Sequence, residues 1–218
     1  IQFSISEKVT LGSKAFKNCS KIEVVALNKA NSVVVEKECF FCNNNLKSIA
    51  FIANSVILNE NFIKNCSSLS FVTIICSNEI TIFTDTFQGC NLKNVILKSA
   101  SNLKLMDSCF CQSTTLELVV LKGKSVIIGN ECFTNCKSLK SLIIKTEENI
   151  NLSSNTFGEC ELLKSLFLRS NSSLILGNKF MNNAKKLEKV DLIAKNVIVG
   201  DNCFANCFSL TKFAVVNS

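Results

Sequence analysis

The sequence contains no proline, histidine, tyrosine or tryptophan, and its 218 residues include only seven glycines. Without histidine, the chain lacks the most common general base and the most common metal-binding side chain. Without tyrosine, it lacks a second proton donor. Glycine-rich phosphate loops and nucleophile elbows are also absent from the sequence. We therefore expect a protein that is not an enzyme and that holds no catalytic, cofactor or metal site.

Long apolar runs are missing as well. No uninterrupted apolar stretch approaches the roughly 18 residues that a membrane helix needs, and no charged-then-apolar leader is visible. The composition of 47% hydrophobic and 19% charged residues, with a formal net charge of +7, is typical of a packed globular chain. We predict that these residues include no transmembrane segment.

A chain that uses so few residue types suggests one short unit copied many times. Nine anchor positions, separated by 23 or 24 residues, recur along the chain at Phe16, Phe40, Ile63, Phe87, Phe110, Phe133, Phe157, Met181 and Phe204. Six residues after each anchor begins an L-x-x-L-x-L pattern, as in Leu139-Leu142-Ile144; only the copy at Leu92 begins one residue early. Apolar residues that alternate in this way predict a strand. The regular period predicts one solenoid of about nine repeats over residues 1–218.

Each repeat contains a second alternating pair, seven and five residues before the anchor, such as Val126 and Ile128. This pair predicts a second short strand. Between the two strands, apolar residues lie one before the anchor, at the anchor, and three and six after it, which is helical spacing. The predicted fold is therefore an α/β repeat solenoid with two short parallel strands and a short helical turn in each repeat of 23 or 24 residues.

Thirteen cysteines raise the question of thiol chemistry. Ten of them occupy two slots, one three residues after the anchor and one directly before it, and the same slots hold Ala184 and Ala15 in other repeats. A metal site would not accept alanine, so the slots indicate compact side chains that face the core. Cys39 and Cys42 have the spacing of a redox or zinc half-site, but no second pair lies nearby. Disulfides between repeats remain possible.

The segments "LGSKAFKNCSKIEVVAL", "IGNECFTNCKSLKSLII" and "VGDNCFANCFSLTKFAV" resemble the BspA-like leucine-rich repeats. The resemblance implies a right-handed solenoid and a surface protein of bacteria or parasitic protists that attaches to host matrix or to other cells. This chain lacks the proline that usually follows the strand, so the strand is expected to run longer. The replacing residues are Asn28, Ile52, Ile75, Lys98, Lys122, Lys145, Arg169, Ile193 and Val216.

Four consecutive replaced positions are cationic, namely Lys98, Lys122, Lys145 and Arg169. Neighbouring parallel strands lie about 4.8 Å apart, and like charges at that distance in water repel by about 0.9 kcal/mol per pair. Two residues earlier on the same strands lie Ile96, Val120, Ile143 and Phe167. An apolar stripe edged by cations is typical of an interaction surface. We predict that these eight residues bind a partner.

The partner is expected to be an anionic, partly apolar protein segment, a sulfated glycan or an anionic lipid surface. Nucleic acid is disfavoured, because the stripe lacks the arginines and stacking aromatics that nucleic-acid-binding proteins use. A simpler interpretation is that outward strand positions often take β-branched residues, and that a chain of net charge +7 carries scattered lysines. Both interpretations are compatible with the sequence.

The two ends resemble interior repeats, because Ile1–Phe3 and Phe213–Val215 both fit the end of the strand pattern. Solenoids usually carry polar terminal repeats, so we expect a segment of a longer repeat protein without its caps, or end-to-end self-association. Two functional classes follow. The resemblance favours a non-enzymatic interaction or adhesion module at the cell surface or outside the cell. Abundant thiols and no visible secretion signal favour a cytoplasmic structural scaffold or filament component.

Overall fold

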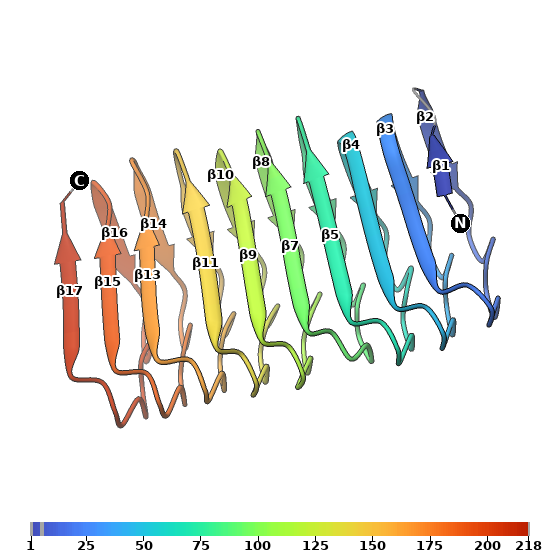
Figure 1. Ribbon diagram of the computed structural model, residues 1–218. Helices are drawn as coiled ribbons and strands as arrows, with labels where there is room; N and C mark the ends of the chain where they lie inside the picture. Colours follow the sequence, from blue (N-terminus) through green and yellow to red (C-terminus); the bar gives the residue numbers. More distant parts are fainter. Residues whose placement is uncertain (1, 5–6, 218) are drawn as a thin grey trace.

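The chain winds through two facing layers of strands. The structure, a computed structural model, describes residues 2–4 and 7–217. In Figure 1 each coil rises through the front layer, crosses over the top, descends through the rear layer and advances from the N-terminus toward the C-terminus. This path is right-handed. The predicted solenoid of about nine coils is confirmed.

Every strand pairing is parallel, and each strand lies beside its counterparts in the neighbouring coils. The front layer contains β1 (Gln2–Ser4), β3 (Val24–Val35), β4 (Ser48–Leu58), β5 (Phe71–Cys76), β7 (Asn94–Ser99), β9 (Leu118–Gly123), β11 (Ser141–Thr146), β13 (Ser165–Arg169), β15 (Lys189–Ile193) and β17 (Lys212–Val216). The rear layer contains β2 (Lys8–Leu11), β6 (Ile80–Ile82), β8 (Asn102–Leu105), β10 (Ser125–Ile128), β12 (Ile150–Leu152), β14 (Ser173–Leu176) and β16 (Asn196–Val199). The long strands β3 and β4 continue into the rear layer and join the two layers.

The two predicted strands of each repeat are confirmed, and their alternation sets which side chains are buried. In β9, Val119 and Leu121 are fully buried, whereas Lys122 between Leu121 and Gly123 is exposed. The strand includes Lys122, which occupies the position of the missing proline. Because the repeat keeps its register, Leu121 lies between Leu97 and Ile144 of the adjacent coils. Identical slots therefore stack into continuous columns of buried side chains.

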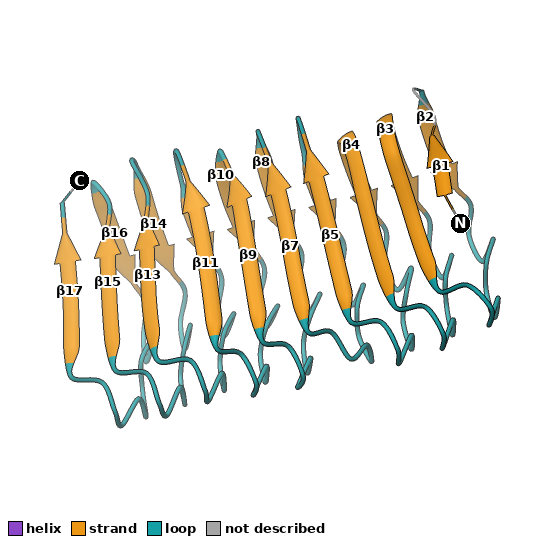
Figure 2. Ribbon diagram, in the orientation of Figure 1, coloured by secondary structure: helices purple, strands orange, loops and turns teal. Residues whose placement is uncertain are grey.

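The predicted helical turn is wrong, because residues 2–4 and 7–217 contain no helix (Figure 2). In each repeat the residues two before and two after the anchor have positive φ, for example Glu131 at 55° and Asn135 at 64°. An α-helix needs negative φ at every residue, so two left-handed residues per turn exclude it. Backbone groups bond to the next coil instead, as when the Phe133 N–H donates to the Thr156 carbonyl at 2.8 Å. The fold is therefore a β-solenoid rather than an α/β solenoid.

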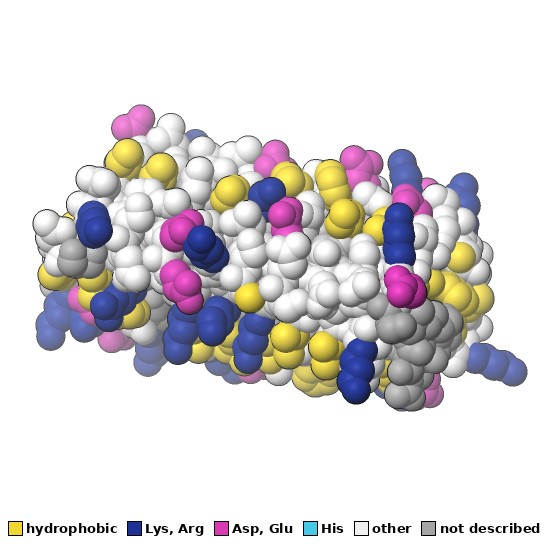
Figure 3. Space-filling model, turned by 90° about the horizontal axis from the view of Figure 1, so that it is seen from above, with side chains coloured by type: hydrophobic (Ala, Val, Ile, Leu, Met, Phe, Trp, Pro, Cys, Tyr) yellow, Lys and Arg dark blue, Asp and Glu magenta, His cyan; other side chains and the backbone are white. Residues whose placement is uncertain are grey.

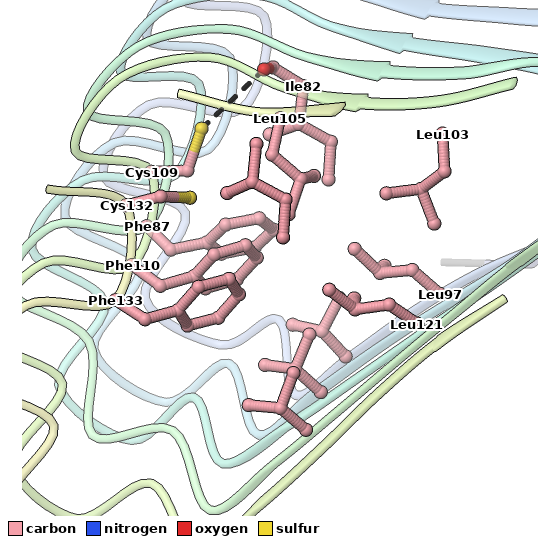
Figure 4. Packing of buried hydrophobic residues seen from close by; sticks show 14 of the residues in the cluster. Ile82, Phe87, Leu97, Leu103, Leu105, Cys109, Phe110, Leu121, Cys132 and Phe133 are labelled. Carbon is pink, nitrogen blue, oxygen red and sulfur yellow. Dashed lines mark hydrogen bonds between the residues drawn. The ribbon is translucent and has the colours of Figure 1, made fainter. Parts of the chain in front are cut away.

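A column of phenylalanine rings runs along the interior of the solenoid beside the turns, and leucine side chains fill the space next to it (Figure 4). The Phe110 and Phe133 ring centroids are 4.9 Å apart, and so are those of Phe133 and Phe157, with interplanar angles of 5° and 2°. Where the anchor is Ile63 or Met181, the ring comes from the residue before it, and these rings meet their neighbours edge-on at 77–81°. The aromatic column thus stays continuous although two anchors are not aromatic.

The cysteines pack into this core, as the alanine substitutions between repeats predicted. Nine of the thirteen thiols are buried, and all thirteen are free. The slot after the anchor also has a polar role, because the Cys66 thiol donates to the Phe40 carbonyl at 3.1 Å. In the equivalent slot, the Asn43 side chain donates to the Phe16 carbonyl at 2.8 Å. The slot therefore favours a small side chain that can donate a hydrogen bond to the preceding coil.

The last coil exposes side chains whose counterparts are buried in the preceding coil. Phe213 and Val215 of β17 are 48% and 51% exposed, whereas Val190 and Leu192 of β15 are fully buried. The expected end-to-end association stays a prediction. No helix within the described residues has the length and apolar character to cross a bilayer.

Candidate interaction surface

The outward face of the front sheet brings the four predicted cations together. Lys98 pairs in register with Lys122, Lys122 with Lys145, and Lys145 with Arg169, on β7, β9, β11 and β13. All four side chains are exposed. We call these four residues the cation row. Figure 3 shows Lys and Arg side chains gathered with hydrophobic ones along one long margin of the molecule.

A second row, the apolar row, runs beside the cation row and consists of Ile96, Val120, Ile143 and Phe167. Val120 pairs in register with Ile96 and with Ile143. Ile143 and Phe167 are 38% and 53% exposed, while Ile96 and Val120 are half-buried. These positions alternate with the buried residues of the same strands, so the fold forces them outward and packing does not explain their apolar character.

Both rows end at the same coils. Along the apolar row, Thr73 precedes Ile96 and Asp191 follows Phe167, and Asp191 is ion-paired with Lys189 at 2.6 Å. Two isoleucines flank the cation row, because Ile75 precedes Lys98 and Ile193 follows Arg169 in the paired strands. The eight predicted residues thus form one bounded patch across four coils.

The surface is hollowed along this patch. One hollow of about 330 Å³ is lined by residues that include Ile143, Lys145, Phe167 and Arg169. A second, of about 250 Å³, shares Ile143 and Lys145 and adds Lys98, Val120 and Lys122. A third, of about 300 Å³, shares Lys98 and Lys122. The three hollows are therefore consecutive, and cationic and apolar side chains line the first two.

The charges of the cation row are not neutralised by ion pairs within the described part of the chain. Eight lysines elsewhere in the described residues form an ion pair, and seven of them meet a glutamate of an adjacent coil, as in Lys47–Glu23 at 2.9 Å and Lys140–Glu117 at 3.0 Å. Among the described residues, no member of the cation row lies within 4.0 Å of a carboxylate. The front face thus carries four adjacent cations that no ion pair between described residues neutralises.

The comparisons with known proteins identify the repeat. The family model for the BspA type leucine rich repeat region, a six-copy model, matches residues 1–117 and 104–218. The chain belongs to this family. BspA-type repeat proteins are commonly interaction or adhesion modules, are generally not enzymes and are typically associated with the cell surface.

Among solved structures, the chain is similar to a leucine-rich repeat protein from Bacteroides ovatus. The two are 15% identical, the alignment covers 95% of this chain and 78% of that chain, and the TM-score is 0.41. No curated protein matches the chain.

In this BspA-type chain, sequence reasoning missed residues that line the hollows beyond the two rows. Thr146 follows Lys145 in the first hollow, and Lys124 and Glu147 lie in the third. Lys124 is neutralised by Glu148 at 3.0 Å. These residues lie at or beyond the ends of the strands, where the repeat is irregular and the L-x-x-L-x-L pattern gives no register. The turn of the chain after each front strand, rather than spacing along the strand, brings them to the patch.

Proposed function

We propose that this chain is a non-enzymatic interaction module that uses the cation row and the apolar row to hold an anionic, partly apolar partner at a cell surface. The observation that carries the proposal is that both rows occupy the same four coils and end together. The apolar row adds a hydrophobic contact surface that surface lysines alone would not supply, and the cation row adds charges that an apolar stripe alone would lack. Charge complementarity at such a patch speeds association and selects partners.

The proposal predicts that binding depends on the cation row. In a Lys122→Glu/Lys145→Glu/Arg169→Glu variant, affinity for poly-glutamate and for heparin oligosaccharides is expected to fall at least about tenfold, because three attractive contacts become repulsive. The wild-type affinity itself is expected to fall as salt screens exposed charges. Fluorescence anisotropy titrations at several salt concentrations measure both effects.

A matched control variant distinguishes an effect of the patch on binding from an effect of the net charge of the whole chain. The Lys21→Glu/Lys37→Glu/Lys186→Glu variant makes the same change in charge at exposed positions outside the patch. It should bind within about twofold of the wild type, since exposed charges beyond a Debye length of about 10 Å are largely screened. Equal losses in the two variants would sink the proposal, and so would wild-type binding that ignores salt.

A second candidate function, an intracellular scaffold, is favoured by the thirteen free thiols, because disulfides are rare in reducing compartments. Residues 1–218 are expected to carry thirteen alkyl groups when the protein is alkylated under denaturing conditions, directly in its cells of origin and without prior reduction. Mass spectrometry counts these groups. Each bridged pair would remove two groups and would count against a reducing compartment.

A further inference from the structure

We infer that the partner segment is an acidic, amphipathic α-helix that lies along the solenoid axis, across strands β7, β9, β11 and β13. This inference rests on the proposed function and specifies the partner of the same patch. Its acidic stripe would contact the cation row, and an adjacent apolar stripe would contact the apolar row. Charge spacing, the apolar row and the shape of the patch each favour a helix.

Charge spacing distinguishes a helix from an extended peptide. The cation row advances by about 4.8 Å per coil, so its four members span about 14 Å. Acidic residues on one helix face recur every turn, or about 5.4 Å, and four of them span about 16 Å. Side chains on one face of an extended peptide recur at about 6.7 Å, and four would span about 20 Å. Flexible lysine side chains can absorb the first mismatch more readily than the second.

The apolar row distinguishes a helix from a sulfated glycan. Phe167 is 53% exposed and Ile143 is 38% exposed. A hydrophilic glycan has few apolar groups to pack against these side chains, so it would not remove their apolar surface from water. The two rows lie two residues apart along each strand, which is about 6.6 Å. On a helix, side chains at i and i+1 point about 100° apart around the axis. A helix with an acidic stripe and an apolar stripe at adjacent positions can therefore contact the cation row with one stripe and the apolar row with the other.

The shape of the patch also suits a helix. The hollows of about 330 Å³ and 250 Å³ follow one another along the solenoid axis and share Ile143 and Lys145. Side chains that project from successive turns of one helix face could enter consecutive hollows. The patch is bounded by Thr73 and Asp191 in the apolar row, so about three helical turns would cover it.

The probe is a synthetic peptide of about 18 residues, long enough for helix formation to be measurable. It carries glutamate at positions i, i+4, i+7 and i+11, and leucine at the position after each glutamate, on an alanine and glutamine background. In the control peptide each leucine is moved one further residue along the chain. This shift keeps composition and charge but turns the apolar stripe away from the acidic one.

The first peptide is expected to bind about tenfold more tightly than the control peptide, and its helical circular dichroism should increase on binding. The Ile143→Ser/Phe167→Ser variant should lose this tenfold preference while it binds heparin oligosaccharides as the wild type does. Both substituted side chains are exposed, so the variant is expected to keep its fold, which its thermal unfolding curve checks.

The possible outcomes separate this inference from the function on which it rests. If both peptides and heparin bind equally, and binding still needs the cation row, the interaction module stands and the helical partner is overturned. If heparin binds more tightly than the first peptide, the partner is a glycan and the inference also fails. If none of the three binds with salt dependence, the proposed function itself is wrong.

Discussion

Replacement of Phe133 by alanine is expected to lower the free energy of unfolding by about 3–5 kcal/mol. The Phe133 ring is fully buried and lies 4.9 Å from both the Phe110 ring and the Phe157 ring, measured between centroids. Its removal leaves a cavity in the buried interior of the solenoid and interrupts two coil interfaces. Because solenoid stability is approximately a sum of repeat and interface terms, the loss is not shared by distant coils. Urea denaturation, followed by circular dichroism, measures the change.

Phe167 supplies the matched control, because it is also a phenylalanine but is 53% exposed. The Phe167→Ala variant should change the free energy of unfolding by no more than about 0.5 kcal/mol, as is usual for surface substitutions. A further variant, Phe133→Leu, keeps most of the volume and should lie between the two. If Phe133→Ala cost less than about 1 kcal/mol, the continuous aromatic column could not be a main source of stability.

The strands could be predicted from sequence because the same pattern of apolar and polar positions recurs in nine repeats. A single L-x-x-L-x-L match is weak, but a column such as Leu97, Leu121 and Ile144 stays apolar in each coil because each residue is buried by its neighbours. The period fixes the parallel register, since any shift by one residue would bury Lys122 and expose Leu121. The outward rows followed from the same alternation.

The turns could not be predicted in the same way, because apolar spacing near the anchor resembles a helix. The residues that distinguish this turn from a helix are the polar ones between the apolar positions, and the spacing of apolar residues takes no account of them. Six of the nine positions two residues after the anchor are asparagine or glycine, the residues that most readily take positive φ. These positions are Asn18, Asn65, Gly89, Asn135, Asn183 and Asn206. Recurrent asparagine or glycine at one slot is therefore a signal against a helix.

The ring column shows a second limit of sequence reasoning. The anchor slot changes to Ile63 and Met181 in two repeats, and alignment alone suggests two gaps in the aromatic column. Phe62 and Phe180 fill those gaps from the preceding slot by turning their rings to angles of 77–81° with their neighbours. A side chain from a neighbouring position can fill the same space in the core, so an aromatic residue before the anchor can replace one at the anchor.

The second large effect is expected at alkaline pH, where the protein should unfold between about pH 10 and pH 11. Burial raises the pKa of the Cys66 thiol from 9.0 to about 11, and the pKa values of the Cys90 and Cys160 thiols to about 12. Burial also raises the pKa of Cys39 to about 11 and that of Cys76 to about 12. The folded chain therefore holds these five protons at pH values where the unfolded chain releases them.

The direction of the effect follows from proton binding. Below about pH 9 the thiols are protonated in both states, so their contribution to stability is fully present. Between pH 9 and the folded-state pKa values the native state binds more protons, so stability falls as pH rises. Each such thiol costs about 1.4 kcal/mol per pH unit, and five cost about 7 kcal/mol per unit. This slope is comparable with the whole stability of a typical domain, about 5–15 kcal/mol.

The Cys160→Ala variant tests whether the thiols cause this slope, because Ala184 occupies the equivalent slot in a later coil and is fully buried there. Urea denaturation at pH values from 7 to 10.5 should give a slope that is smaller by about 1.4 kcal/mol per pH unit above pH 9 and unchanged below it. The slope is independent of any packing loss that the substitution causes, since that loss is the same at each pH. An unchanged slope would assign the alkaline transition to other groups. The buried thiols would then fill the core without contributing to the pH dependence of stability.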